Sequence, residues 1–156
     1  MGLFSFLKNV GKKRTPVKTE PTADELRAQN RSLAQDIFNG IKGLELDIKE
    51  LSVTVDGDKA IIGGVTTTQA DKEKAILEAG NTNGIASVDE NITVEEPAPE
   101  AKFYEVQRGD SLSKIAKVQY GDAMKYPVIF EANKPMLSDP DKIYPGQVLR
   151  IPELQA

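Results

Sequence analysis

The stretch LSVTVDGDKAIIGGV, residues 51–65, determines the fold class of the first half of the chain. Apolar and polar residues alternate over residues 51–55, which is typical of a strand with one buried face. The segment DGDK that follows predicts a turn, and the apolar residues 60–65 predict a returning strand. Together these residues predict a β-hairpin.

Helices are predicted on both sides of this hairpin. Thr22 opens the capping-box sequence TADE and predicts the start of a helix. Thr68 predicts the start of a second helix, which ends at Ala79 with Gly80 in the position after its last turn. Residues 85–94, IASVDENITV, predict a closing strand. The order helix, strand, strand, helix, strand predicts a small α+β domain with its helices on one face of the sheet.

A linker separates this domain from a second one. The sequence EEPAPEA combines two prolines with acidic residues and alanine, which disfavours helix and sheet and favours an extended spacer. We place the linker at residues 96–102, the first domain at residues 23–95 and the second domain at residues 103–152.

The second domain has its own pattern of elements. The sequence FYEVQ predicts a strand, Asp110 predicts the cap of a helix that stops at Gly121, and Pro127 suits the first turn of a further helix. The sequence QVLRI predicts the last strand. The expected order is therefore β-α-α-β, in a domain near the lower size limit for independent stability.

The N-terminal arm, residues 1–14, is basic. Its apolar residues have helical spacing, at Leu3, Phe4, Phe6, Leu7 and Val10. Residues 1–18 hold five basic and no acidic side chains, whereas residues 19–101 hold 17 acidic and 7 basic ones. We expect a short amphipathic helix that docks on the acidic first domain. A membrane surface is the alternative docking partner, and without interleaved aromatic residues nucleic acid is not expected.

Composition excludes several kinds of chemistry. The chain has no cysteine and no histidine, so it lacks disulfides, a thiolate nucleophile and the commonest general base. The paired aspartates at 56/58 and 139/141 lie in turn-like sequence, where Asp is favoured for local reasons. No apolar run is long enough to span a membrane. A secretory signal peptide is not expected either, because the positive charges follow the first apolar residues instead of preceding them. We expect a cytoplasmic, monomeric protein that is not an enzyme.

Two resemblances agree with this organisation. The motifs VQRGDSL, IFEAN and IYPGQVLRIP resemble those of LysM domains and cover residues 103–152. The sequences IIGGV and GIASV in residues 23–95 resemble those of BON domains. The order BON then LysM is similar to that of a family of bacterial cytoplasmic potassium-binding proteins, whose members bind K⁺ as their ligand.

The uncharged stretch EAGNTNGIAS, residues 78–87, is the expected ion site. Helix ends leave carbonyl oxygens unpaired, and neutral oxygens suit a large, weakly hydrated cation. An ordinary helix end that leads into a strand is the alternative. The resemblance points to this segment and to the arm, and implies that K⁺ is held by the main-chain carbonyls of Leu7, Val10, Lys12, Gly80, Thr82 and Ile85. It also implies that ion binding draws the two domains together.

A second function stays open. LysM domains bind N-acetylglucosamine polymers in a shallow groove, so the resemblance implies a glycan site on the second domain. Its residues would include Gly109, Asp110, Ser111, Leu112, Met136 and Ile143. The absence of a recognisable export signal disfavours this glycan as the physiological ligand. The same residues could instead serve only to form turns.

Overall fold

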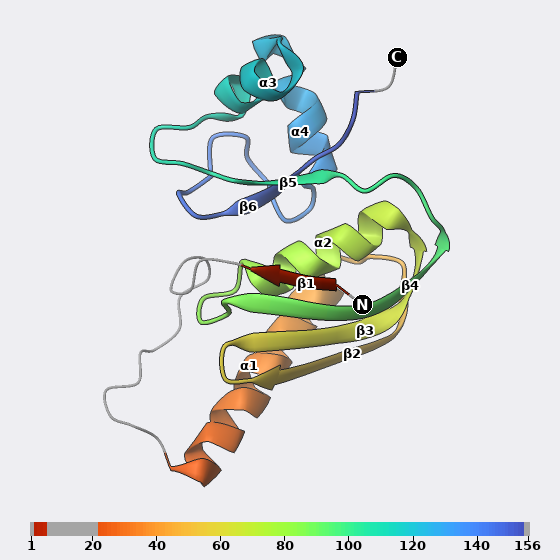
Figure 1. The fold of residues 1–156 in the computed structure, drawn as a ribbon, viewed down its shortest axis with the longest axis vertical. Coiled ribbons are helices and arrows are strands. Elements are labelled where there is room, and N and C mark those ends of the chain that lie inside the picture. Colours follow the sequence, from red (N-terminus) through yellow and green to blue (C-terminus); the bar gives the residue numbers. More distant parts are fainter. Residues whose placement is uncertain (1, 6–21, 155–156) are drawn as a thin grey trace.

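The computed structural model describes residues 2–5 and 22–154 of the chain. The α+β class is confirmed, and Figure 1 shows two units, one above the other, joined by a single connection. The elements in chain order are β1 (Gly2–Ser5), α1 (Ala23–Gly43), β2 (Ile48–Asp56), β3 (Lys59–Thr68), α2 (Gln69–Gly80), β4 (Ser87–Glu96), β5 (Lys102–Glu105), α3 (Leu112–Tyr120), the 3₁₀ turn η1 (Ala123–Lys125), α4 (Tyr126–Ala132) and β6 (Val148–Ile151).

The N-terminus differs from its prediction. Residues Gly2–Ser5 form the strand β1, where the spacing of apolar residues predicted the beginning of a helix. This strand pairs antiparallel with β4, from Gly2 opposite Glu90 to Ser5 opposite Ser87. The edge of β4 offers a row of unpaired main-chain groups, and their pairing with β1 outweighs the weak preference of a short isolated helix. Residues 6–14, the rest of the predicted helix, lie outside the described residues.

The first unit is a four-stranded sheet in the order β1-β4-β3-β2. Strands β2 and β3 form the predicted hairpin, with Asp56 opposite Lys59 at its turn. Strands β3 and β4 are parallel, with Lys59 opposite Ser87, because α2 crosses back over the sheet between them. The helix α2 is therefore held at both ends by neighbouring strands.

Both helices of the first unit start as predicted. The Thr22 hydroxyl accepts a hydrogen bond from the Glu25 N–H, and the Thr68 hydroxyl accepts one from the Asp71 N–H, each at 3.2 Å. The helix α1 continues to Gly43, and Ile41 extends its buried stripe. Both helices contribute to one core with the sheet, so they cover the same face.

The second unit pairs β5 with β6 antiparallel and packs α3 and α4 around a core of its own. The first helix is capped by Ser111, whose hydroxyl accepts a hydrogen bond from Lys114 N–H at 3.2 Å, and not by Asp110 as predicted. It ends at Gly121, which has the expected left-handed conformation with φ +78°. The order β-α-α-β is confirmed, with η1 added before α4.

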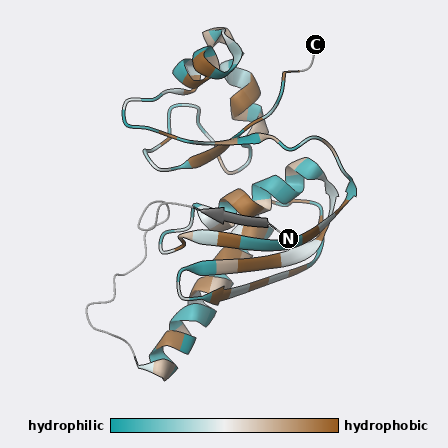
Figure 2. Cartoon of the chain, viewed as in Figure 1, coloured by the Kyte–Doolittle hydropathy of each residue, from teal (hydrophilic) through white to brown (hydrophobic). Residues whose placement is uncertain are grey.

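The helix α2 lies between the sheet and the second unit (Figure 1). Eight of its twelve residues are buried, including the charged Glu73 and Glu78. The core of the first unit continues across the boundary to Val148 of β6, with Phe103 and Met136 packed against it. Figure 2 shows hydrophobic residues on the strands of the sheet and on β6, on either side of α2. The two units thus share one apolar contact surface.

Candidate functional site

The predicted ion site lies at the end of α2, in residues 80–85, here named the corner. Gly80 was predicted to follow the helix, but it is the last helical residue and Asn81 is the cap. The left-handed glycine of the turn is Gly84, with φ +99°. A residue with a Cβ atom is strained in that conformation, so Gly84 is the glycine that allows the chain to turn into β4.

The main-chain oxygens of the corner differ in their partners. Thr82 O accepts a hydrogen bond from Ile85 N–H at 3.1 Å. The carbonyls of Gly80 and Ile85 accept no hydrogen bond from the described part of the chain. Because a carbonyl oxygen has two lone pairs, all three of these predicted oxygens keep acceptor capacity. Thr82 and Ile85 are buried, so the corner belongs to the packed body of the first unit.

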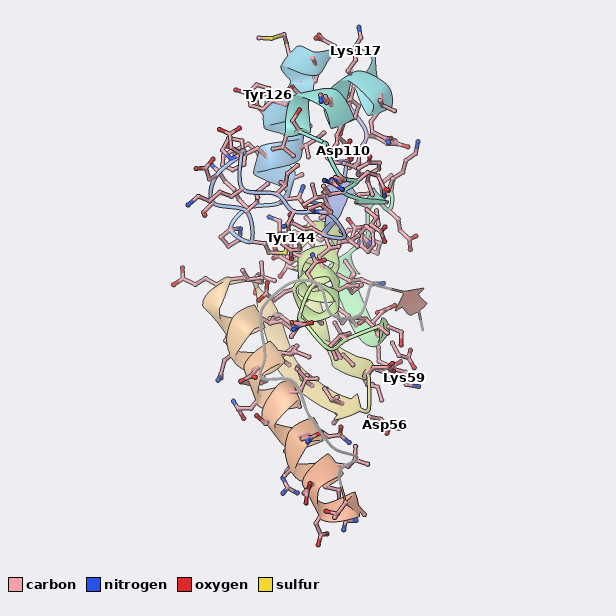
Figure 3. The ribbon with its side chains drawn as sticks, turned by 90° about the vertical axis from the view of Figure 1, so that its left-hand side faces the viewer. Asp56, Lys59, Asp110, Lys117, Tyr126 and Tyr144 are labelled. Carbon is pink, nitrogen blue, oxygen red and sulfur yellow. The ribbon has the colours of Figure 1, made fainter. Side chains whose placement is uncertain are left out.

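The end of α2 at the corner is a favourable place for a cation. The last turn of α2 carries no basic residue, and Glu78 in that turn is buried. The carbonyl end of a helix carries a partial negative charge. Burial raises the pKa of Tyr144 to about 12, and the nearby Glu78 carboxylate adds to the shift. Figure 3 shows Tyr144 near α2, at the boundary between the two units.

The three predicted ligands in the arm, Leu7, Val10 and Lys12, lie outside the described residues. The described part of the arm nevertheless ends beside the corner. Ser5, the last residue of β1, is paired with Ser87, two residues after Ile85. Pairing of β1 with β4 therefore brings the chain that precedes Leu7 to the end of β4 where the corner lies.

The corner is bonded directly to the second unit through Asn81. Its side-chain amide donates to Val148 O and its Oδ1 accepts from Val148 N–H, both at 2.9 Å. Two residues further along β6, the side chain of Asn133 makes the equivalent pair of bonds with Arg150 N–H and O. Two asparagine side chains therefore form hydrogen bonds with the main-chain N–H and C=O groups on the edge of β6 that faces away from β5.

A second link between the units is centred on Glu73 of α2. Its Oε1 accepts a hydrogen bond from Arg150 Nε at 2.8 Å, and both side chains are buried. Its Oε2 accepts from Gln69 Nε2 and from Ala101 N–H in the connection between the units. The same carboxylate therefore joins the first unit, the connection and the second unit.

The predicted glycan residues do not share one environment. Leu112 is buried in the core of the second unit and Ile143 packs against that core, whereas Met136 packs against the core of the first unit. Asp110 Oδ2 accepts hydrogen bonds from Tyr104 Oη at 2.6 Å and from Gln107 N–H at 2.8 Å. Gly109, with φ +86°, forms the turn before Ser111. All of these residues have structural roles within the described chain.

Other chemistry finds no support in the described residues. They contain no cluster of three acidic side chains that could hold a metal ion. Within the same residues, no helix is both long and apolar enough to cross a membrane.

Sequence reasoning did not identify Asn81, Glu73 and Arg150 as the residues that join the units. One signal was present in the sequence VLRI, where an arginine interrupts an otherwise apolar strand and so calls for a buried acidic partner. The partner itself could not be chosen from the sequence.

Comparisons with known proteins extend this description. A BON domain model matches residues 29–96 and a LysM domain model matches residues 104–152. The potassium binding protein Kbp of Escherichia coli O6:H1 is 44% identical over 155 residues, which cover 98% of this chain and 99% of that protein. An uncharacterized protein of Deinococcus radiodurans is 36% identical over 132 residues, 77% of this chain and 51% of that protein.

Proposed function

Since the chain belongs to the family of the potassium binding protein Kbp, we propose that it binds a potassium ion at the corner. The observation that carries the proposal is the set of main-chain oxygens at the carbonyl end of α2. Those of Gly80 and Ile85 have no hydrogen-bond donor among the described residues, and that of Thr82 has one. These oxygens lie next to the start of β4, where the pairing of β1 with β4 also brings the arm.

The ligand set we propose consists of six carbonyl oxygens, three from the corner and three from the arm. The corner contributes Gly80, Thr82 and Ile85, and the arm contributes Leu7, Val10 and Lys12. Neutral oxygens replace the hydration shell of K⁺, which holds its water weakly. Magnesium favours carboxylates and retains several waters, so this set discriminates against it.

Ion binding is coupled to the second unit in this proposal. Asn81 lies between two proposed ligands, Gly80 and Thr82, and its side chain is bonded to Val148. An ion that orders the main chain of the corner also orients Asn81 for these two bonds. The protein is then a cytoplasmic, non-enzymatic potassium sensor that becomes more compact when K⁺ binds.

Thermal unfolding in different salts tests the binding proposal. The protein is melted in potassium, sodium and magnesium chloride at matched ionic strength. A ligand that binds only the folded state raises the Tm, so the Tm should be highest in potassium chloride. Equal Tm values in the three salts would exclude potassium binding.

Three variants locate the site. Gly80→Val and deletion of residues 1–12 should each abolish the potassium-dependent rise in Tm, because each removes or displaces proposed carbonyls. Thr82→Ala should keep that rise, since the main chain is retained. It should lower the Tm in every salt, because the bond from its hydroxyl to Glu78 O contributes about 1 kcal/mol. A potassium response that survives the deletion would contradict the arm ligands.

A glycan-binding function is the second candidate, favoured by the LysM match at residues 104–152. It predicts retention of the protein on N-acetylglucosamine polymer. That retention should decrease on substitution of exposed residues near Gly109 while the response to K⁺ is unchanged. Failure to bind the polymer, together with a Tm that responds only to K⁺, would leave the ion as the ligand.

A further inference from the structure

One side-chain oxygen of the corner has no hydrogen-bond partner among the described residues. Among the described residues, Asn83 Oδ1 is the only buried side-chain nitrogen or oxygen atom without a hydrogen bond. Its neighbours differ in this respect, because Asn81 bonds with Val148 and the Thr82 hydroxyl donates to Glu78 O. A buried oxygen without a protein partner is unfavourable, so this atom has acceptor capacity that a ligand can use.

We infer that Asn83 Oδ1 is a side-chain ligand of the cation, in addition to the main-chain carbonyls. This inference rests on the proposed potassium site and adds the one ligand that a substitution can remove without altering the main chain. An amide oxygen is neutral and has the same chemistry as a peptide carbonyl. It therefore completes a shell of neutral oxygens without introducing a formal charge.

The place of Asn83 in the sequence fits a ligand of the cation. Its residue lies between Thr82 and Ile85, which both carry proposed ligand carbonyls. Leaving its oxygen unpaired makes the ion-free protein less stable, and binding of the ion removes that cost. Asn83 therefore contributes to the difference in stability between the ion-free and ion-bound states.

The experiment measures the Tm of the full chain and of Asn83→Ala in choline chloride, sodium chloride and potassium chloride at matched ionic strength. In choline chloride the variant should melt at or above the wild-type Tm, because the unpaired oxygen is gone. In potassium chloride its rise in Tm should be much smaller, and its affinity for K⁺ by calorimetric titration should fall at least about tenfold. Asn91→Ala, at an exposed asparagine of β4, is the matched control and should behave as wild type.

A second variant, Asn83→Asp, keeps the size of the side chain and adds a charge. A carboxylate interacts more strongly with small, hard cations, so the ratio of the K⁺ affinity to the Na⁺ affinity should fall. This comparison of two ions in one folded protein does not depend on how much Asn83→Ala destabilises the chain.

The outcomes separate the inference from the proposed function. Loss of the potassium increment in Asn83→Ala, with the expected change of ion preference in Asn83→Asp, supports the ligand. A wild-type response to K⁺ that both variants retain unchanged overturns the inference and leaves the potassium site in place. A Tm of Asn83→Ala that falls equally in all three salts also overturns it, because it identifies a structural role. If the wild type itself does not respond to K⁺, the proposed function fails and the ligand fails with it.

Discussion

The carboxylate of Glu73 and the guanidinium of Arg150 form an ion pair between residues 77 positions apart in the sequence, with Oε1 and Nε 2.8 Å apart. The side chains are 3% and 10% exposed, so water screens the pair very little. Arg150 NH1 also donates to Ala132 O at 3.0 Å, which ties the same guanidinium to the end of α4. Each unit therefore supplies one charge of a buried ion pair, and this pair helps to fix the relative position of the two units.

The effects of removing the two charges of this pair should not add. Glu73→Gln or Arg150→Met leaves an unpaired buried charge and should cost about 3–5 kcal/mol of unfolding free energy, whereas the double variant should cost less than the two single variants added together. Urea unfolding of the four proteins gives the coupling energy.

The exposed pair of Glu131 and Lys134, 2.9 Å apart, is the control for this cycle. Glu131→Gln should change the unfolding free energy by less than about 1 kcal/mol, since exposed pairs contribute little. If Glu73→Gln costs no more than Glu131→Gln, the buried pair does not hold the units together.

Asn81→Ala should weaken the contact between the units and leave the proposed ion ligands intact. The change removes both bonds with Val148 and exposes the edge of β6, at an expected cost of about 1–3 kcal/mol. In the presence of K⁺, protease cleavage of the variant in the connection, residues 97–101, should be faster than cleavage of wild type. Its affinity for K⁺ by calorimetric titration should stay within a few-fold of wild type.

Asn81→Asp refines this test because it keeps the acceptor for Val148 N–H and loses the donor to Val148 O. The cleavage rate of Asn81→Asp should be close to that of Asn81→Ala, since the new carboxylate faces the carbonyl oxygen of Val148. Cleavage at the wild-type rate in both variants would show that Asn81 does not couple the corner to the second unit.

The pKa of Tyr104 should report the position of Asp110. A hydrogen bond from the phenol to the Asp110 carboxylate, with burial as a smaller cause, raises the pKa of Tyr104 from 10.0 to about 12. The folded pKa lies above the unfolded one, so this bond stabilises the protein fully below pH 10 and its contribution is lost as the pH rises to about 12.

Absorbance titration of tyrosinate checks this prediction, with Tyr104→Phe to assign the transition. Asp110→Asn should lower the pKa of Tyr104 towards 10.0 and leave Tyr144 near 12, because burial is the main cause of the latter shift. A Tyr104 transition that does not move in Asp110→Asn would mean that the two side chains are not bonded in solution.

Gly64→Ala should destabilise the first unit. Gly64 has φ +152°, and a Cβ atom there would lie 2.9 Å from Lys49 O of the neighbouring strand, closer than such atoms approach. Strain of this kind costs about 1–3 kcal/mol, and thermal unfolding measures it.

Gly43→Ala is the matched control, at the last residue of α1. Nothing lies within 4 Å of its added Cβ and its φ is not positive, so the change should be neutral or stabilise by up to about 1 kcal/mol. Equal Tm values for the two variants would contradict the close approach of β3 to Lys49.

Local features of the fold were predictable. Thr22 and Thr68 act as caps because a threonine hydroxyl reaches the N–H three residues later whatever surrounds the helix. The hairpin of β2 and β3 followed from alternation and a turn, which are also local. Ser111 and Asp110 show the limit of such reasoning. Adjacent residues can both cap a helix, and here Tyr104 from another strand binds Asp110 and leaves the cap to Ser111.

The candidate site was predictable as a segment but not as an arrangement. The sequence identified an uncharged, glycine-containing end of α2, yet it assigned the turn to Gly80 when Gly84 has the left-handed conformation. It predicted a helix for the arm where β1 forms a strand. The apolar residues of the arm do have helical spacing. The edge of β4 with which the arm pairs exists only in the folded sheet, so the sequence does not display it.

From its sequence alone, the chain determines two α+β units, the starts of both helices of the first unit, and a corner rich in neutral oxygens. These follow from interactions between residues a few positions apart, which a sequence displays directly. Tertiary structure decides which side chains bridge the units, as Glu73 with Arg150 and Asn81 with Val148. It also decides which oxygen stays unpaired at Asn83, because burial and partners at that atom depend on chain segments that only folding brings together.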